Sequence, residues 1–255
     1  MKSIWNGSIS FGMVNIPVKL YTAVDRSETV HFKLLYDEDR TPIEYRRWSK
    51  EHDIEVPWEK IVKGVDMGDG NMYVFTKEEL DSLRPERSDV IEILHFVDSD
   101  EVEDLYYDKH YFVGPTRSKD RPYSLLLNAL KRTGRMAIGK FIMREREYIC
   151  AIGPMGKGLL LSTLHYSYEI RRIEDIKEVE EVPDPGEEEI KLAIQLIDHL
   201  YLEELDMDEF RDCYAERLKK AIESRDEDHV VVLEGEREAT SDENLIDMLR
   251  ASLEV

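Results

Sequence analysis

The chain opens with MKSIWNGSISFGMVNIPVKLY, residues 1–21, and this stretch decides the fold class. Apolar residues alternate with small polar ones up to Met13, and the alternation resumes in the opposite phase from Val14. A period of two predicts β-strand, and a change of phase beside Gly12 predicts a sharp bend or a tight pair of strands. The chain therefore begins with β-structure and not with a helix.

Further short strands and one longer helix are expected before residue 173. Pro122 suits a first helical turn and Gly134 a C-cap, which predicts a helix over 122–133. Thr76 opens a capping box, and Pro85 ends the short helix that follows it. Many short strands with tight turns favour a barrel or a sandwich. Strands are predicted at 30–34, 43–47, 73–75, 90–96, 111–113, 136–143, 148–152 and 159–166.

The composition changes near residue 173, and VPDPG at 182–186 is a clear break. Apolar residues spaced three and four apart then predict helices over 187–202 and 207–222. A charged stretch follows at 225–240, and a short terminal helix is predicted over 244–253. We expect three regions: a β-rich core over 1–182, a helical arm over 183–225 and an acidic tail over 226–255.

The charge is distributed unevenly along the chain. The formal net charge is −21, yet residues 117–172 hold 12 Lys/Arg against 4 Asp/Glu, a local net charge of +8. Residues 173–255 carry −19. Because the Debye length is about 8 Å at physiological salt, a phosphate responds mainly to the charges beside it. A basic surface can therefore bind a polyanion although the whole molecule is acidic.

The composition excludes several classes of protein. The chain has 255 residues and two distant cysteines, Cys150 and Cys213, so it has no disulfide framework and no Cys-x-x-Cys pair. It shows no apolar run of membrane-spanning length and no secretory signal. We expect a protein of the reducing cytoplasm that contacts no membrane and holds no metal or cofactor.

Two features resemble catalytic sites only weakly. Residues 153–158 are glycine-rich, but their spacing is too short for a phosphate-binding loop and no Ser or Thr follows Lys157, so a hairpin is the better interpretation. Cys150 and His165 could form a nucleophile–base pair, but Cys150 lies in an apolar run that favours a core position. The sequence therefore predicts no enzyme.

The basic residues are the more specific candidates, because they gather in an otherwise acidic chain. Some surround a strand that carries Tyr45 and Trp48, and aromatic residues among cations suit nucleic-acid binding. The residues predicted to bind DNA are Lys33, Arg40, Arg46, Arg47, Lys50, Lys63, Arg117, Lys119, Arg132, Arg135, Arg144, Arg146 and Lys157.

The chain also resembles the prokaryotic Ku family, the DNA-end-binding proteins of non-homologous end joining. The resemblance covers roughly residues 1–222, and its strength lies in the order and spacing of individually modest motifs. These motifs are GSI at 7–9, FG at 11–12, VNIPVKLY at 14–21, IEYRR at 43–47, IVKG at 61–64, LRPE at 83–86, IEILHFV at 91–97, HYFVGP at 110–115, RTGRMAI at 132–138, TLHY at 163–166, EIKLA at 189–193 and RDCY at 211–214.

The resemblance implies an α+β, β-rich fold with a seven-stranded type of β-barrel core and a C-terminal helical arm. It also implies a ring-shaped homodimer that threads onto double-stranded DNA ends and recruits an ATP-dependent DNA ligase in double-strand break repair, in association with the nucleoid. Residues 40–63 resemble the family's bridge over the DNA, and the basic segment resembles the cradle below it.

The chain departs from the family in three ways, one of which is its unusually negative overall charge of −21. Residues 48–53 lack the Cys-x-x-Cys pair that many members carry, and the C-terminal tail is acidic where many members have a Lys-rich one. The alternative function is a β-barrel module that binds an acidic or phosphorylated protein through the basic segment. Sequence-independent binding of DNA ends remains the preferred hypothesis.

Overall fold

The computed structural model of the chain describes residues 1–25, 27, 29–85 and 88–224. The chain divides into two compact units. Of the described residues, those within 1–27 and 60–202 form the first unit, and those within 29–59 and 203–224 form the second. The predicted terminal helix at 244–253 lies outside the described residues.

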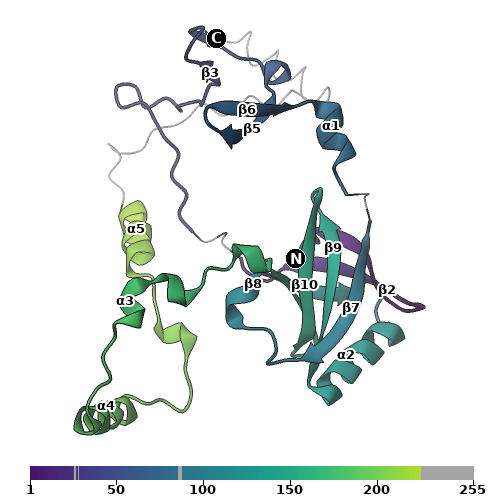
Figure 1. Cartoon of the computed structure of the whole chain (residues 1–255), viewed down its shortest axis with the longest axis vertical. Helices are drawn as coiled ribbons and strands as arrows, with labels where there is room; N and C mark the ends of the chain where they lie inside the picture. Colours follow the sequence, from purple (N-terminus) through teal and green to yellow (C-terminus); the bar gives the residue numbers. More distant parts are fainter. Residues whose placement is uncertain (26, 28, 86–87, 225–255) are drawn as a thin grey trace, which may run out of the picture. The chain divides into compact units, whose positions relative to one another are not determined.

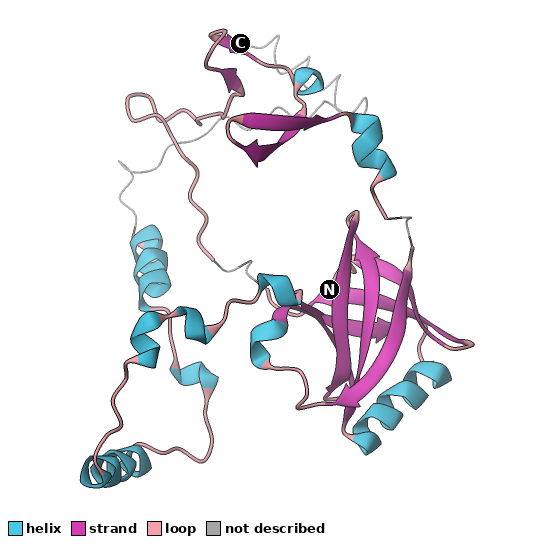
Figure 2. Cartoon of the chain, viewed as in Figure 1, coloured by secondary structure: helices cyan, strands magenta, loops and turns pink. Residues whose placement is uncertain are grey.

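The first unit contains a closed seven-stranded barrel (Figure 2). Neighbouring strands run antiparallel, except that β7 closes the barrel by pairing parallel to β1. A closed barrel leaves no unpaired strand edge. The predicted barrel core is therefore confirmed. The strands follow the order β1 (Trp5–Phe11), β2 (Val14–Thr22), β8 (Tyr107–Pro115), β11 (Gly158–Leu164), β10 (Arg146–Met155), β9 (Arg135–Met143) and β7 (Val90–Asp98).

The opening sequence forms a tight pair, as one of its two interpretations predicted. Strands β1 and β2 pair from Phe11↔Val14 to Trp5↔Leu20, and Gly12 in the turn has a φ of +58°. Ile9 and Ile16 oppose each other and are fully buried. The change of phase between the strands thus lets both send their apolar side chains into one core.

Helix α2 (Arg121–Thr133) packs across one end of the barrel (Figure 1). The Asp120 side chain accepts a hydrogen bond from the Tyr123 amide at its start, and Gly134 ends it with a φ of +67°. The buried Tyr123 hydroxyl donates to the Val113 carbonyl at 2.6 Å and accepts from the Leu159 amide at 3.0 Å. These bonds tie the helix to β8 and β11.

Two segments lie outside the barrel. We call residues 23–89, between β2 and β7, the insertion. We call residues 165–224, after β11, the C-terminal segment. The insertion contains β3 (Trp48–Ser49), β4 (Ile54–Glu55), a 3-10 turn (Trp58–Lys60), β5 (Lys63–Gly68), β6 (Asn71–Phe75) and α1 (Lys77–Ser82).

The C-terminal segment is helical. Its elements are 3-10 turns at Ser167–Glu169, Ile173–Asp175 and Met207–Glu209, with α3 (Lys177–Glu180), α4 (Glu187–His199) and α5 (Cys213–Glu223). A further 3-10 turn, Asp104–Tyr106, precedes β8 in the barrel unit. No helix in the described part of the chain is both long enough and apolar enough to cross a bilayer.

Three expectations about these segments were wrong in detail. The strands predicted at 30–34 and 43–47 do not form, and only an isolated bridge pairs Leu35 with Pro42. Alternation predicts which side chains share a face, but a strand also needs a backbone partner along its length. The helix predicted from 207 begins at Cys213, because the Asp212 carboxylate caps the Tyr214 and Ala215 amides. The helix predicted over 187–202 ends at His199.

Candidate nucleic-acid interface

The strand register divides the candidate residues of the barrel and α2 between two opposite ends of the barrel. The end of β2, the start of β7, the β9–β10 turn and the end of β11 lie together at what we call the insertion end. The β1–β2 turn, the end of β8, the start of β9 and the β10–β11 turn lie at the opposite α2 end. Both segments outside the barrel leave from the insertion end.

Arg144 and Arg146 lie at the insertion end, in and beside the β9–β10 turn. Arg144 and Glu145 form the turn, with φ angles of 51° and 68°. Non-glycine residues adopt this left-handed conformation at a cost of about 1 kcal/mol each. The turn holds Arg144 at the tip of the hairpin, and Arg84 of the insertion pairs with Glu145 at 3.1 Å.

An aromatic cluster accompanies these arginines, and sequence reasoning had not selected it. The Arg146 guanidinium lies 6.0 Å from the centroid of the Tyr148 ring. Tyr166 and Tyr168 stack with centroids 5.4 Å apart and rings inclined by 11°, and Tyr168 is 81% exposed. Burial, helped by the negative charge of Glu147, raises the pKa of Tyr166. The only sequence signal was tyrosines close to Arg171 and Arg172.

Five predicted residues lie at the α2 end. Lys119 adopts a φ of 60° in the β8–α2 loop, and Arg135 pairs with Asp98 at 3.2 Å. Nearby, the Lys131 ammonium donates to the Gly156 carbonyl at 2.6 Å. The basic segment is therefore not one continuous lining but two clusters separated by the length of the barrel. The five are Arg117, Lys119, Arg132, Arg135 and Lys157.

The other six predicted residues lie in the insertion, and several already have partners. Arg46 pairs with Glu55 at 3.5 Å, and Arg47 lies 5.3 Å from the Trp58 ring centroid. Arg40, with a φ of 61°, pairs with Asp37. Exposed pairs of this kind contribute about 0–1 kcal/mol, so a phosphate can displace them at little cost. The six are Lys33, Arg40, Arg46, Arg47, Lys50 and Lys63.

The β3–β4 hairpin occupies the region where the family resemblance would place a Cys-x-x-Cys pair. Trp48 pairs with Glu55 and Ser49 with Ile54, and the Trp48 indole N–H donates to the Asp53 carboxylate at 3.1 Å. These bonds connect the two strands and the turn between them. Within the described residues, no three His, Cys, Asp or Glu side chains are placed to hold a metal ion together.

The two weak catalytic candidates do not form sites. Residues 153–158 form the β10–β11 hairpin, with Met155 opposite Gly158, as preferred from the sequence. Cys150 is fully buried opposite Thr163, and burial raises the pKa of its thiol to about 12. His165 instead lies 3.6 Å from the Glu169 carboxylate. A thiol with this pKa is not a nucleophile at neutral pH.

Comparison with known proteins gives a consistent result. A family model described as the Ku70/Ku80 beta-barrel domain matches residues 10–192. The non-homologous end joining protein Ku of Archaeoglobus fulgidus is 38% identical over 256 residues, covering 100% of this chain and 99% of that protein. The Heliobacterium modesticaldum protein of that name is 36% identical, covering 91% and 83%. The Bacillus subtilis one is 30% identical, covering 98% and 80%.

Proposed function

The chain belongs to the Ku family, and from this membership we propose that it binds the ends of broken double-stranded DNA as a ring-shaped homodimer in non-homologous end joining. The observation that carries the proposal is the contrast, among the described residues, between a barrel that buries its apolar side chains and two segments whose large apolar side chains are exposed. The segments would be covered by a second copy, and the ring would be closed around the duplex.

The distribution of buried side chains supports the homodimer. Every buried side chain in the described part of the chain belongs to residues 5–163, in the barrel or α2. Outside the barrel and α2, Phe32, Tyr45 and Trp58 of the insertion are 65–85% exposed, and Ile194 and Ile197 of α4 are also exposed. Large apolar surfaces of this kind are typical of protein interfaces. A two-fold partner would cover the same surfaces on both chains.

The two-stranded sheets of the insertion also support a homodimer. Strands β3 and β4 pair over two residues each, and β5–β6 forms a separate two-stranded sheet. An isolated hairpin is at best marginally stable in water and needs a further strand or an apolar cover. In the proposed dimer the partner chain provides that cover.

The grip on DNA would be electrostatic and independent of sequence. We propose that the six cations of the insertion contact phosphates, and that Arg144 and Arg146 of the barrel do so as well. Phosphate contacts carry no base information. Each neutralised phosphate contributes about −0.9 to the slope of log K against log salt concentration. A dimer carries two copies of every contact.

Specificity for ends would come from topology. A closed ring can be entered only at a free terminus, so the protein needs no chemical recognition of the broken end. Recruitment of an ATP-dependent DNA ligase to the held end, and association with the nucleoid, complete the proposal, which assigns the chain a binding role and no catalytic step.

A competition gel-shift experiment tests end recognition. The full-length protein is bound to a labelled linear duplex and challenged with unlabelled linear or covalently closed circular DNA of the same sequence. We expect the linear competitor to displace the label at least tenfold more effectively per mole of DNA. Equal competition by the two forms would reject end binding.

A further inference from the structure

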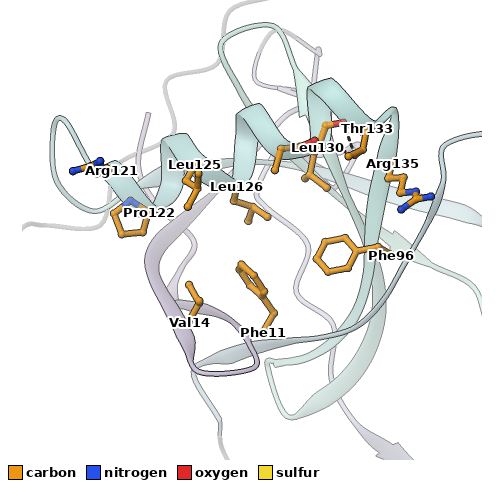
Figure 3. A pocket seen from close by; sticks show the side chains of 11 residues that line it. Phe11, Val14, Phe96, Arg121, Pro122, Leu125, Leu126, Leu130, Thr133 and Arg135 are labelled. Atoms are coloured by element: carbon orange, nitrogen blue, oxygen red, sulfur yellow. Dashed lines mark hydrogen bonds between the residues drawn. The ribbon is translucent and has the colours of Figure 1, made fainter.

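An apolar groove of about 690 Å³ lies at the α2 end of the barrel. One wall is formed by Phe11, Val14 and Phe96, from the β1–β2 hairpin and β7, and the other by Leu125, Leu126 and Ala129 of α2. Figure 3 shows Phe11 and Phe96 facing Leu126 across the groove, with Arg121 at one end and Arg135 at the other.

The groove is accessible and apolar. Leu126 is buried, but its neighbour Leu125 is 70% exposed, and Phe96 opposite it is 44% exposed. Phe96 is held in place by an edge-to-face contact with Phe11, whose ring centroid is 6.1 Å away. A concave apolar surface with a few charged groups at its margin is typical of a site that binds a protein segment.

The charge around the groove restricts the occupant. Helix α2 carries three basic residues, Arg121, Lys131 and Arg132, and no acidic residue, in a chain of net charge −21. Arg135, at one end of the groove, already binds the Asp98 carboxylate at 3.2 Å. Arginine suits carboxylates because its planar guanidinium offers paired donors.

A DNA duplex is a poor occupant of this groove. The accessible backbone of a duplex presents phosphates and sugars, which do not supply apolar side chains to pack against the walls of the groove. The groove and the Arg144 turn also lie at opposite ends of strands of 7–10 residues, which rise about 3.3 Å per residue, so they are separated by more than a Debye length of about 8 Å. The basic residues at the α2 end therefore act independently of those at the insertion end.

We propose that this groove binds an acidic amphipathic segment of a partner protein. Apolar side chains of the segment fill the space between Leu125 and Phe96, and its carboxylates meet Arg121 at one end and Arg135 at the other. This is the mode in which an amphipathic helix lies in a groove. As a recruitment surface for a repair partner, the groove rests on the proposed function, whereas the binding of the segment itself does not.

Peptide selection on the full-length protein tests this inference. A phage-displayed library of random 16-residue peptides is selected on the wild type, and peptides that also bind Leu125→Asp are removed. We expect the survivors to combine Leu, Phe or Trp with Asp or Glu. A synthetic survivor, followed by fluorescence anisotropy, should bind Leu125→Asp and Arg121→Glu at least tenfold more weakly, and Arg121→Lys less than threefold more weakly.

Two control variants separate the groove from general charge and folding effects. Lys157→Glu changes the charge at the same end of the barrel without lining the groove, and it should leave peptide affinity within twofold of the wild type. Leu125→Asp changes an exposed side chain and should unfold at the wild-type temperature. The inference is overturned if no selected peptide depends on Leu125, or if the selected peptides lack acidic residues.

Two measurements on Leu125→Asp would reveal a second copy of the chain or DNA as the occupant of the groove. If Leu125→Asp lowered the solution mass of the protein, the groove would be an interface between copies. If it weakened binding of linear duplex, the groove would belong to DNA. Either result contradicts the inference. Loss of end preference in the wild type, with peptide binding intact, would instead reject the proposed function and leave the groove as a peptide site.

Discussion

The barrel and the segments outside it differ in where their apolar side chains go. In the barrel, Ile9, Phe141 and Leu161 are at most 2% exposed and share one core. In the insertion and the C-terminal segment, side chains as large as Tyr45 and Trp58 remain in contact with solvent. Within the described residues, the barrel buries its own apolar side chains, whereas the insertion and the C-terminal segment leave large apolar side chains exposed, as the proposed homodimer requires.

The largest expected effect comes from breaking the barrel core. Phe141→Ala removes a ring that contacts Trp5 and Tyr148, with centroids 6.0 and 5.8 Å away. The cavity should lower the free energy of unfolding by about 3–5 kcal/mol. Urea denaturation measures this loss. Leu105→Ala, at a side chain 60% exposed, is the control and should change the free energy of unfolding by less than about 1 kcal/mol. A loss below about 1 kcal/mol for Phe141→Ala would contradict the barrel as the stabilising core.

The second effect concerns the apolar face of α4. Ile197→Asp places a charge where we propose that a second copy packs, and it should weaken dimerisation at least tenfold, which corresponds to about 1.4 kcal/mol. Analytical ultracentrifugation over a range of concentrations measures the change. Because Ile197 is 65% exposed in the chain, the substitution should not change the temperature at which the barrel unfolds. Gln195→Asp, on the polar side of the same helix, should leave the mass unchanged. Equal masses for wild type and Ile197→Asp at all concentrations would show that this face is not in the interface.

The third effect concerns the insertion and its cations. Replacing Arg46 and Arg47 together by Ala removes four cations from the proposed dimer. It should weaken binding to duplexes of any sequence at least tenfold and reduce the slope of log K against log salt concentration by about 3–4, at about 0.9 for each lost phosphate contact. Filter binding at several salt concentrations measures both quantities. The Arg46→Lys and Arg47→Lys pair retains the charge and should retain most of the slope. A loss that depended on the sequence of the duplex would contradict a grip on phosphates.

The smallest effect separates the two ends of the barrel. Arg144 and Lys119 both adopt left-handed φ angles, 51° and 60°, so glycine at either position should stabilise the fold by about 0.5–1 kcal/mol. Only Arg144→Gly should also weaken DNA binding, because Lys119 lies at the α2 end. Thermal unfolding and gel shift on both variants make the comparison. Equal weakening of DNA binding by both would mean that the two ends act together on the duplex.

The sequence was sufficient for the strands and turns of the barrel because their signals are local, whereas the choice of a barrel over a sandwich came from the family resemblance. Alternation around Gly12, the cap residues of α2 and the short turn at Pro154–Gly158 each depend on neighbouring residues, and the structure confirms them. The strands expected at 30–34 and 43–47 failed because alternation does not identify a hydrogen-bonding partner. The start of α5 was misplaced because the Asp212 cap outweighed an apolar periodicity that extends further towards the N-terminus.

The candidate site was predictable in composition but not in arrangement. Segment 117–172 runs through α2, β9, β10 and β11, so successive groups of cations fall at opposite ends of the barrel. Linear charge counts cannot show this division, because it depends on strand direction and register. The Tyr166–Tyr168 stack depends on the path of the chain after β11, and the groove depends on side chains from β1, β2, β7, β9 and α2.

The most direct test of the central claim is a trapping measurement. The protein is loaded onto a linear duplex, the duplex is closed into a circle by ligation, and the complex is challenged with high salt. A threaded ring should remain on the circles and leave within the mixing time once a restriction enzyme cuts them, because only topology retains it. Dissociation from intact circles as fast as from linear DNA would contradict the account.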